Sequence, residues 1–533
     1  MAGQPFNIEP AAAGRAVLAA PVIAIFPPLL RSRRVLRGHR RPATTMLTPP
    51  EDHVNQPHSY GPAERRIIAI LLMSAFVVIL NETTMNVARS RIMADFDVGE
   101  RTAQWLTTGF MLGMAIVIPV TGWLIERFTT RQVFLSAMTL FSLGTLLAAA
   151  APTFSLLLLG RLFQASGTAM ILPLLMTTVM QLVPRSERGR VMGTNSLVIA
   201  VAPAIGPALS GILLQFGGWR LIFVAMLPIV LTMLVLGALL LRNTAGNRAL
   251  PLDGWSVALT VLAFGPLVYG LSLIGVSGAP AWEAPAAIGA GLVALRIFIW
   301  RQRRLERDGD ALLDLRTFSC PGFTVSLTVL GLMMMALFGT VILLPLVLQR
   351  AYGLEPLAVG LMLLPGGVTM GILGPVAGRL YDRLGARPLV GPATLVVLMA
   401  LIALVFLAPG TKWWAVTCAH VGLSVGLAFL FTPLFTMALG ALPPWLYSHG
   451  SATIGTLQQV AGAAGTAGFV TLFSLTSQRA TGSGLGTTEA LLAGTKVAFL
   501  AAAGVWSLAV IASAFLPAAG DHGDDAEVEA APH

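Results

Sequence analysis

Glu82 and Arg161 are ionisable residues inside long apolar segments, where a charge is costly in free energy. If a helix enters the membrane near residue 67, Glu82 lies roughly 22 Å up a hydrocarbon core of about 30 Å. A helix that enters from the opposite side near residue 155 places Arg161 at a matching level. Burial favours the neutral carboxyl group, whereas a nearby guanidinium favours the ionised form. A carboxylate balanced in this way could carry a proton; a static ion pair between two helices is the alternative.

Two further features are relevant to proton transfer. Residues at four-residue spacing form one partly polar helical face, which we expect to point into a helix bundle. These residues are Ser74, Val78, Glu82 and Asn86. His420 is a second titratable candidate, about 10 Å into a later apolar segment. A histidine with a purely structural role is the alternative at that position.

The sequence offers no sign of another energy source. A nucleotide-driven transporter needs a glycine-rich phosphate loop that ends in Gly-Lys-Ser or Gly-Lys-Thr, and the chain lacks one. It also lacks the HExxH pattern of zinc hydrolases. Cys320 and Cys418 fit no metal spacing and are expected to pack as small apolar residues. We therefore expect a protein that is not an enzyme, needs no cofactor or metal, and is driven by a proton gradient.

Membrane helices are the elements that must position these residues. Of 533 residues, 56% are hydrophobic and 11% charged, which is more apolar side chain than one globular core can bury. Apolar segments long enough to cross a bilayer, at about 20 residues each, recur fourteen times. They run approximately over 67–87, 104–125, 132–151, 155–178, 192–214, 219–241, 254–275, 282–300, 322–345, 354–377, 388–408, 413–437, 452–474 and 494–516. The expected fold class is an all-α polytopic membrane protein.

The distribution of arginines predicts the orientation of the chain. Loops assigned to the inside hold about fifteen basic residues against about seven outside, so we expect both termini to be cytoplasmic and the protein to lie in the cell membrane. The net charge of +10 reflects this bias, and we expect no nucleic-acid partner.

The chain divides into six parts on this reading. Residues 1–64 and 517–533 are expected to be disordered cytoplasmic tails, with Met46 as an alternative translation start. Between them we expect a six-helix bundle at 65–241, two additional helices at 242–300, a cytoplasmic loop at 301–321 and a second six-helix bundle at 322–516.

A charged loop occurs twice, as GWLIERFTTR at 122–131 and GRLYDRLGAR at 378–387. The copies start 256 residues apart. Over eight spans this is about 32 residues per span and loop, which predicts two six-helix halves separated by two additional helices. Glu126 and Asp382 could accept a hydrogen bond from a helix terminus or an arginine in one state and release it in the other. The alternative is that these loops only fix the topology.

These loops resemble the G-x-L-x-D-R-x-G-x-[KR] motif of the major facilitator superfamily, and the chain resembles in particular its fourteen-span drug:proton antiporter family. The first copy carries Glu126 in place of the aspartate and Thr129 in place of the second glycine. The matching positions are Gly122, Leu124, Arg127 and Arg131 in the first copy, and Gly378, Leu380, Asp382, Arg383, Gly385 and Arg387 in the second.

Two further segments carry the resemblance. Residues 157–173 resemble the fourth-span motif and supply Arg161 and Gln164. NETTMNVA at 81–88 resembles the first-span motif D-x-T-x-x-N-V-A, with Asn81 at the aspartate position and Glu82 at the next one. This shift turns the carboxylate by about 100° around the helix.

The segment APAIGPALSG at 202–211 resembles the fifth-span antiporter motif and keeps Gly206, Pro207 and Gly211. A proline removes a backbone donor, and small residues let a neighbouring helix approach, so a bend or a sliding contact is expected there. Helix packing alone is the alternative.

The resemblance implies proton-coupled efflux of lipophilic or cationic small molecules, such as drugs or antibiotics, by alternating access. The candidate residues for proton coupling are Glu82, Arg161 and His420. An amphiphilic substrate needs aromatic faces and a few adjustable hydrogen bonds. The candidates for this cavity are Asn86, Trp105, Phe110, Gln164, Gln349, Gln458 and Gln459.

Two other functions stay open at this point. The chain could export an endogenous metabolite or lipid, or it could be a non-transporting membrane scaffold or sensor. The expected partners are the small-molecule substrate, protons and the lipid bilayer. We expect a monomer, and accessory export subunits are left open.

Overall fold

The regular structure of this chain is helical throughout the part that the computed structural model describes, residues 61–243, 250–274 and 280–516. Within these ranges fourteen helices are long and apolar enough to cross a membrane. This confirms the predicted fold class. A helix satisfies its own backbone hydrogen bonds, which lipid cannot do, so long apolar helices are the form this sequence can adopt there. The predicted tails and Met46 lie outside the described residues.

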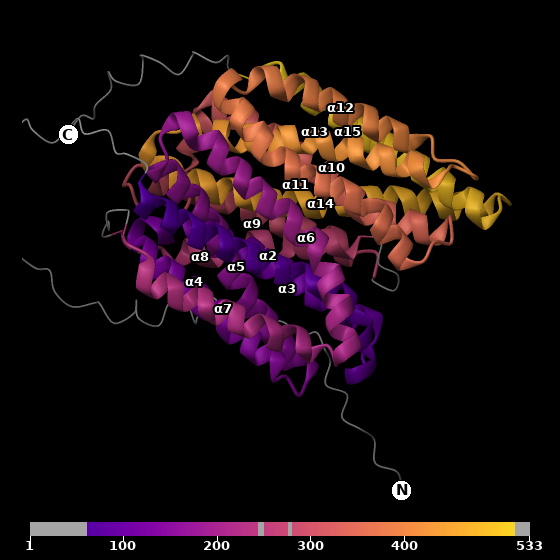
Figure 1. The fold of residues 1–533 in the computed structure, drawn as a ribbon, viewed down its shortest axis with the longest axis horizontal. Coiled ribbons are helices and arrows are strands. Elements are labelled where there is room, and N and C mark those ends of the chain that lie inside the picture. Colours follow the sequence, from indigo (N-terminus) through magenta and orange to yellow (C-terminus); the bar gives the residue numbers. More distant parts are fainter. Residues whose placement is uncertain (1–60, 244–249, 275–279, 517–533) are drawn as a thin grey trace, which may run out of the picture.

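Along the chain the helices form two groups of six, and α8 and α9 lie between these groups in sequence. Figure 1 labels these fourteen helices. The first group is α2 (Pro62–Phe96), α3 (Glu100–Arg127), α4 (Thr130–Ala149), α5 (Phe154–Leu182), α6 (Arg188–Phe216) and α7 (Arg220–Leu240). The pair is α8 (Gly254–Leu273) and α9 (Glu283–Leu305). The second group is α10 (Pro321–Arg350), α11 (Pro356–Leu384), α12 (Arg387–Val405), α13 (Trp413–Gly440), α14 (Tyr447–Gly482) and α15 (Thr487–Ser513). Short 3-10 helices are η1 (Arg185–Glu187), η2 (Leu315–Ser319) and η3 (Pro444–Leu446).

Several helices are much longer than the apolar segments that predict them. The segment predicted at 452–474 belongs to α14, which has 36 residues, and α2 has 35. The reason is physical: an apolar window detects the part of a helix in contact with lipid, whereas the helix continues through polar turns beyond it. Where a helix begins sharply, a cap is present, as at Thr129, whose hydroxyl accepts from the backbone N–H of Gln132.

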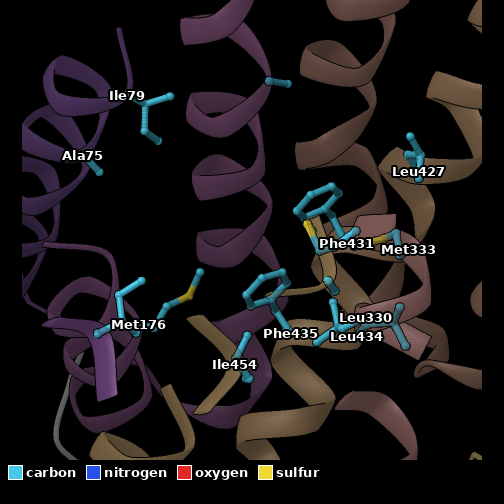
Figure 2. Packing of buried hydrophobic residues seen from close by; sticks show 14 of the residues in the cluster. Ala75, Ile79, Met176, Leu330, Met333, Leu427, Phe431, Leu434, Phe435 and Ile454 are labelled. Atoms are coloured by element: carbon cyan, nitrogen blue, oxygen red, sulfur yellow. The ribbon is translucent and has the colours of Figure 1, made fainter. Parts of the chain in front are cut away.

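The two groups of six contact each other mainly through α6 against α11 and α3 against α14. Figure 1 shows α6 of the first half beside α11 of the second. Their buried side chains belong to one continuous apolar core. Figure 2 shows part of it, with Met176 of α5, Phe435 of α13 and Ile454 of α14 from different halves in one region.

We call the end of the bundle with the two duplicated loops the loop end, and the opposite end the far end. The α8–α9 hairpin packs on the outside of the two halves: α8 contacts both α3 and α14, and α9 contacts α8. Trp105 of α3 stacks on Tyr269 of α8, with ring centroids 5.4 Å apart. Glu283 of α9 accepts a hydrogen bond from Tyr269 (2.7 Å) and one from Arg101 of α3 (3.5 Å). The hairpin is thus fixed to the first half at the far end.

The loop end of the hairpin is also held by polar contacts. Arg301 donates two hydrogen bonds to Asp253, at 2.6 and 2.7 Å. Gln302, which is fully buried, donates to Ser256 Oγ at 2.7 Å. Its Oε1 accepts from two backbone N–H groups of the chain that leads to α10, those of Leu312 (2.8 Å) and Leu313 (3.2 Å). This connection is therefore an ordered part of the loop end.

Candidate functional site

Arg161 lies at the centre of a buried polar cluster in the first half. Its side chain is 1% exposed, and its Nη1 donates to Asn81 Oδ1 at 3.3 Å and to Gln164 Oε1 at 3.0 Å. Gln164 Nε2 donates in turn to Thr145 Oγ1 at 3.0 Å. The guanidinium also lies 4.2 Å from the ring centroid of Phe110, a cation–π distance. Neutral groups from α2, α3, α4 and α5 thus surround one buried positive charge.

Glu82 is half-buried and follows Asn81 on α2. Because Asn81 contacts Arg161, the carboxylate and the guanidinium lie at the same level of the bundle. Arg161 and Glu82 interact electrostatically, but among the described residues no ion pair within 4 Å joins them. Ser74 and Val78, on the same face of α2, are fully buried, so this face points inward.

The cluster retains unused hydrogen-bonding capacity. Arg161 Nε and Asn81 Nδ2 are buried nitrogen atoms without a hydrogen-bond partner in the structure. Buried donors are normally paired. These two are therefore available to an acceptor that reaches the cluster.

His420 lies in the second half, on different helices from the Arg161 cluster. It is half-buried on α13 and packs against α11, where a β-carbon on Gly366 would overlap the imidazole ring. Its Nδ1 is buried without a hydrogen-bond partner. One ring nitrogen is thus without a hydrogen-bond partner, on different helices from Glu82.

The structure places the cavity candidates in different environments. Phe110 and Gln164 belong to the Arg161 cluster. Trp105 packs the hairpin onto α3, as described above. Gln349 is exposed in the last turn of α10 at the far end. The side chain of Asn86 lies outside what the structure describes.

The adjacent glutamines of α14 point to different neighbours. Gln458 Nε2 lies 3.7 Å from the sulfur of Met334 on α10, within the second half. Gln459 Nε2 lies 3.6 Å from the sulfur of Met114 on α3, across the boundary between the halves. Both contacts are with a flexible, polarizable side chain. Of the two glutamines, Gln459 is the one that would lose its contact if the halves separated.

The second copy of the duplicated loop joins the halves through Asp382. Its Oδ1 accepts from the backbone N–H of Gly189 at 2.7 Å, and its Oδ2 accepts from that of Arg190 at 2.8 Å. These donors are in the first turn of α6, where backbone N–H groups have no partner within the helix and the helix dipole favours an anion. Asp382 of the second half therefore caps a helix of the first.

In the first copy, a carboxylate of the first half contacts the start of a helix in the second half. Glu126 Oε1 accepts from Ser448 Oγ at 2.8 Å and lies 3.2 Å from His449 Nε2. Both partners are in the first turn of α14, in the second half. His449 Nδ1 accepts from the backbone N–H of Asp314 at 3.3 Å, so its Nε2 carries the hydrogen that points at the carboxylate. This contact therefore joins both halves and the connection between them.

The two copies also share a contact within each half. Arg131 Nη2 donates to the carbonyl of Ala238 near the end of α7 (2.6 Å), and Arg387 Nη2 donates to that of Ala514 just after α15 (3.2 Å). In each half the last motif arginine thus binds the end of the sixth helix. The duplication is reproduced in three dimensions.

The glycines of the duplicated loops allow close backbone contacts or a tight turn, and the other two arginines lie near the surface. A β-carbon on Gly122 would lie 2.9 Å from His449 Nδ1, and one on Gly378 would overlap the carbonyl of Gly189. Gly385 has φ +79°, which favours glycine, where α11 ends. Arg127 lies over the ring of Phe128 at 5.7 Å, and Arg383 is exposed.

Gly206 and Pro207 lie where α6 crosses α2. A β-carbon on Gly206 would overlap Thr83 of α2, next to Glu82. Despite Pro203 and Pro207, α6 continues as one helix to Phe216. Gly211 has nothing within 4 Å of a β-carbon, so packing in this conformation does not require glycine there.

Gly193→Ala is expected to weaken the closure of the loop end. A β-carbon there would lie 2.7 Å from the carbonyl oxygen of Gly374 and 2.9 Å from Pro375 Cα, and these backbone atoms can give way only if α6 and α11 separate. Alanine is a better helix former than glycine by about 1 kcal/mol, so the helix itself would not suffer. Spin-label distances between the loop ends of α6 and α11 should lengthen. Gly211→Ala, on the same helix in open space, is the control; unchanged distances in Gly193→Ala would refute the expectation.

Three residues of this site are not among the sequence candidates: Ser448, His449 and Asp314. His449 is buried in the sequence YSHGS at the start of α14, and that segment has no motif to flag it. Its partner Glu126 is 323 positions away in the chain, so only the fold pairs them. Within the described ranges, no group of three His, Cys, Asp or Glu side chains could hold a metal ion.

These features define a helical membrane protein of two six-helix halves, with polar contacts between the halves at the loop end. A family model described as Major Facilitator Superfamily matches residues 71–466, and the chain belongs to this superfamily of transporters.

Relatives with descriptive names support the drug-efflux branch of the superfamily. The lincomycin resistance protein LmrB of Listeria monocytogenes is 39% identical over 408 residues, which cover 76% of this chain and 86% of that protein. LmrB of Bacillus subtilis is 35% identical over 411 residues, 76% of this chain and 85% of that protein. A multidrug resistance protein B homologue of Mycobacterium tuberculosis is 29% identical, over 75% of each chain.

Solved structures support the fold. The human organic anion transporter MFSD10 superposes with a TM-score of 0.60 at 15% identity, covering 85% of this chain and all of that one. The proton:xylose symporter XylE gives 0.58 at 14% identity, covering 86% of this chain and 96% of that one. At these identities the likeness concerns the fold alone.

Proposed function

We propose that this protein exports lipophilic or cationic small molecules, including antibiotics, across the cell membrane in exchange for protons. The observation that carries the proposal is Glu82, a carboxylate in the spanning part of α2 at the level of the buried Arg161 cluster. The substrate class rests on the relatives named for lincomycin and multidrug resistance. An intramembrane carboxylate is expensive to keep and is usually functional.

In this proposal Glu82 alternates between a protonated and an ionised form. Arg161 makes its hydrogen bonds with Asn81 and Gln164, so protonation of Glu82 breaks no close ion pair. When the carboxylate is ionised, the unpaired Arg161 Nε and Asn81 Nδ2 are donors that it could reach by a side-chain rotation. A substrate that fits only after the ionised side chain has made this movement would exclude the proton, so substrate and proton would occupy the site in turn. His420 is a candidate for a second proton.

The conformational change in this proposal opens and closes the loop end. If the arginine-rich loops are cytoplasmic, the contacts of Asp382 and Glu126 close the cytoplasmic side in this structure. Protonation from outside would precede separation of the loop end. Substrate would then enter from the cytoplasm.

A susceptibility panel in an efflux-deficient bacterial strain tests the function. Expression of the protein should raise the minimal inhibitory concentration of lincomycin or of other lipophilic drugs several-fold, and Glu82→Gln at equal membrane abundance should not. If the protein is shown to be in the membrane and the minimal inhibitory concentrations of a broad panel of drugs are unchanged, drug export is refuted. Export of an endogenous metabolite would then be favoured.

A further inference from the structure

The outer face of α9 is exposed along its whole length, as expected for a helix face in contact with lipid. Trp282 at its start and Trp300 near its end are 70% and 53% exposed. They lie about 27 Å apart along the helix, close to the thickness of a hydrocarbon core of about 30 Å. Tryptophans gather at the two membrane interfaces. The exposed apolar side chains between them, including Val293 and Ile297, therefore face the acyl chains.

Arg296 is exposed on this lipid-facing helix. It lies about 6 Å inside the level of Trp300, towards the middle of the membrane. Among the described residues no carboxylate lies within 4 Å of its guanidinium. A lipid-facing arginine is costly unless its side chain extends to an anion at the interface. Since the described residues place no carboxylate there, an anion of the membrane interface is a suitable partner for this arginine.

More arginines continue the same face of α9 into the interface. From Arg296, steps of four and three residues lead to Trp300 and Arg303, which is the spacing of one helical face. Arg307 follows in the turn just beyond the end of α9 at Leu305. Arg304 stacks on Trp300, with its guanidinium carbon 3.7 Å from the ring centroid. All four arginines are exposed.

The nearby charged groups leave this face basic. Arg301 is bound to Asp253 and is therefore not part of it. Glu306 accepts from the backbone N–H of Leu315 at 2.6 Å, so its carboxylate is directed at the connection to α10. Asp308 follows beyond the end of α9. The polar contacts of Gln302 and Arg301 fix this end of the hairpin, so the arginines are presented on a rigid support.

We propose that Arg296, Trp300, Arg303, Arg304 and Arg307 form a binding site for the headgroup of an anionic phospholipid. The phosphate lies between Arg296 and the outer arginines, where guanidinium groups can donate paired hydrogen bonds. The acyl chains lie along the apolar face that contains Val293 and Ile297. The site is on the additional hairpin and does not depend on the transported substrate.

Native mass spectrometry of the full-length protein in micelles tests this site. The micelles contain equal amounts of dioleoyl phosphatidylglycerol and dioleoyl phosphatidylcholine, and the lipids retained by the protein are counted. The wild type should retain phosphatidylglycerol in preference. Each basic residue near an anionic surface contributes roughly a fivefold gain in binding. The triple variant Arg296→Gln, Arg303→Gln, Arg304→Gln should therefore lose the preference.

The control removes three exposed basic residues from the far end, as Arg350→Gln, Lys412→Gln, Arg479→Gln. It should keep the preference. Equal retention of phosphatidylcholine by all three proteins shows that they are folded. The site is refuted if the first triple variant still prefers phosphatidylglycerol, or if millimolar inorganic phosphate displaces the lipid. If the first triple variant differs from the wild type in oligomeric state but retains the same lipids, this face is a contact between protein chains instead.

Discussion

Glu82→Gln should abolish transport driven by a pH gradient in proteoliposomes while leaving substrate exchange in the absence of a gradient. Glutamine has nearly the shape of the protonated glutamate, so the packing of α2 against α6, which involves the neighbouring Thr83 and Gly206, is preserved. It cannot release or take up a proton. Its amide oxygen can still accept from the unpaired donors Arg161 Nε and Asn81 Nδ2, so substrate can bind, but no proton is exchanged for it and the expected loss of coupling is complete.

Glu355→Gln is the matched control, because that glutamate is exposed at the start of α11, at the far end. It should transport as the wild type does. Substrate exchange measured in the same vesicles shows that each variant is folded and inserted. If Glu82→Gln transports against a gradient with undiminished coupling, Glu82 is not the proton carrier.

Asp382→Asn should reduce turnover at least as strongly as Glu126→Gln. Asp382 accepts from two backbone N–H groups, at 2.7 and 2.8 Å, whose directions are fixed by α6. An asparagine offers one oxygen and directs its NH₂ group at the other donor. Hydrogen bonds to a charged group contribute about 1.5–3 kcal/mol, so the ratio of closed to open loop ends should fall roughly 10- to 100-fold.

Glu126→Gln should have the milder effect, because its partners can adapt. The Ser448 hydroxyl can rotate, and a glutamine oxygen can still accept from Ser448 or from His449 Nε2. Transport rates and spin-label distances across the loop end measure both variants. Loss of transport in Glu126→Gln with normal transport in Asp382→Asn would reverse the assigned order.

The sequence predicts the fold well because the relevant physics is local. Apolar segments of bilayer length predict fourteen helices. The 256-residue offset of the duplicated loops predicts their order, which is six helices, then two, then six, and the structure has that order. The helix ends are less well predicted, since polar turns extend α2 and α14 beyond the lipid. Loop residues such as Asp382 could be singled out because their motif has a recognisable spacing.

The partners of the candidate residues could not be predicted in the same way. Counting residues along each helix places Glu82 and Arg161 at the same depth in the membrane. It does not reveal that Arg161 donates to Asn81, because Asn81 and Glu82 are neighbours that point about 100° apart around α2. Trp105 was a cavity candidate on its type alone, yet it stacks on Tyr269 of the additional hairpin. Pairings between distant helices need the tertiary structure.

The most direct test of proton exchange is to let a substrate gradient drive proton movement across the membrane and to measure the resulting change in pH. Proteoliposomes loaded with substrate and a lumenal pH indicator are diluted into substrate-free buffer of the same pH, with the membrane potential clamped. As substrate leaves, protons should enter and the lumen should acidify, whichever way the protein is inserted. Glu82→Gln should show no such change. A constant lumenal pH during measured efflux by the wild type, or an alkaline shift, would contradict the proposed antiport.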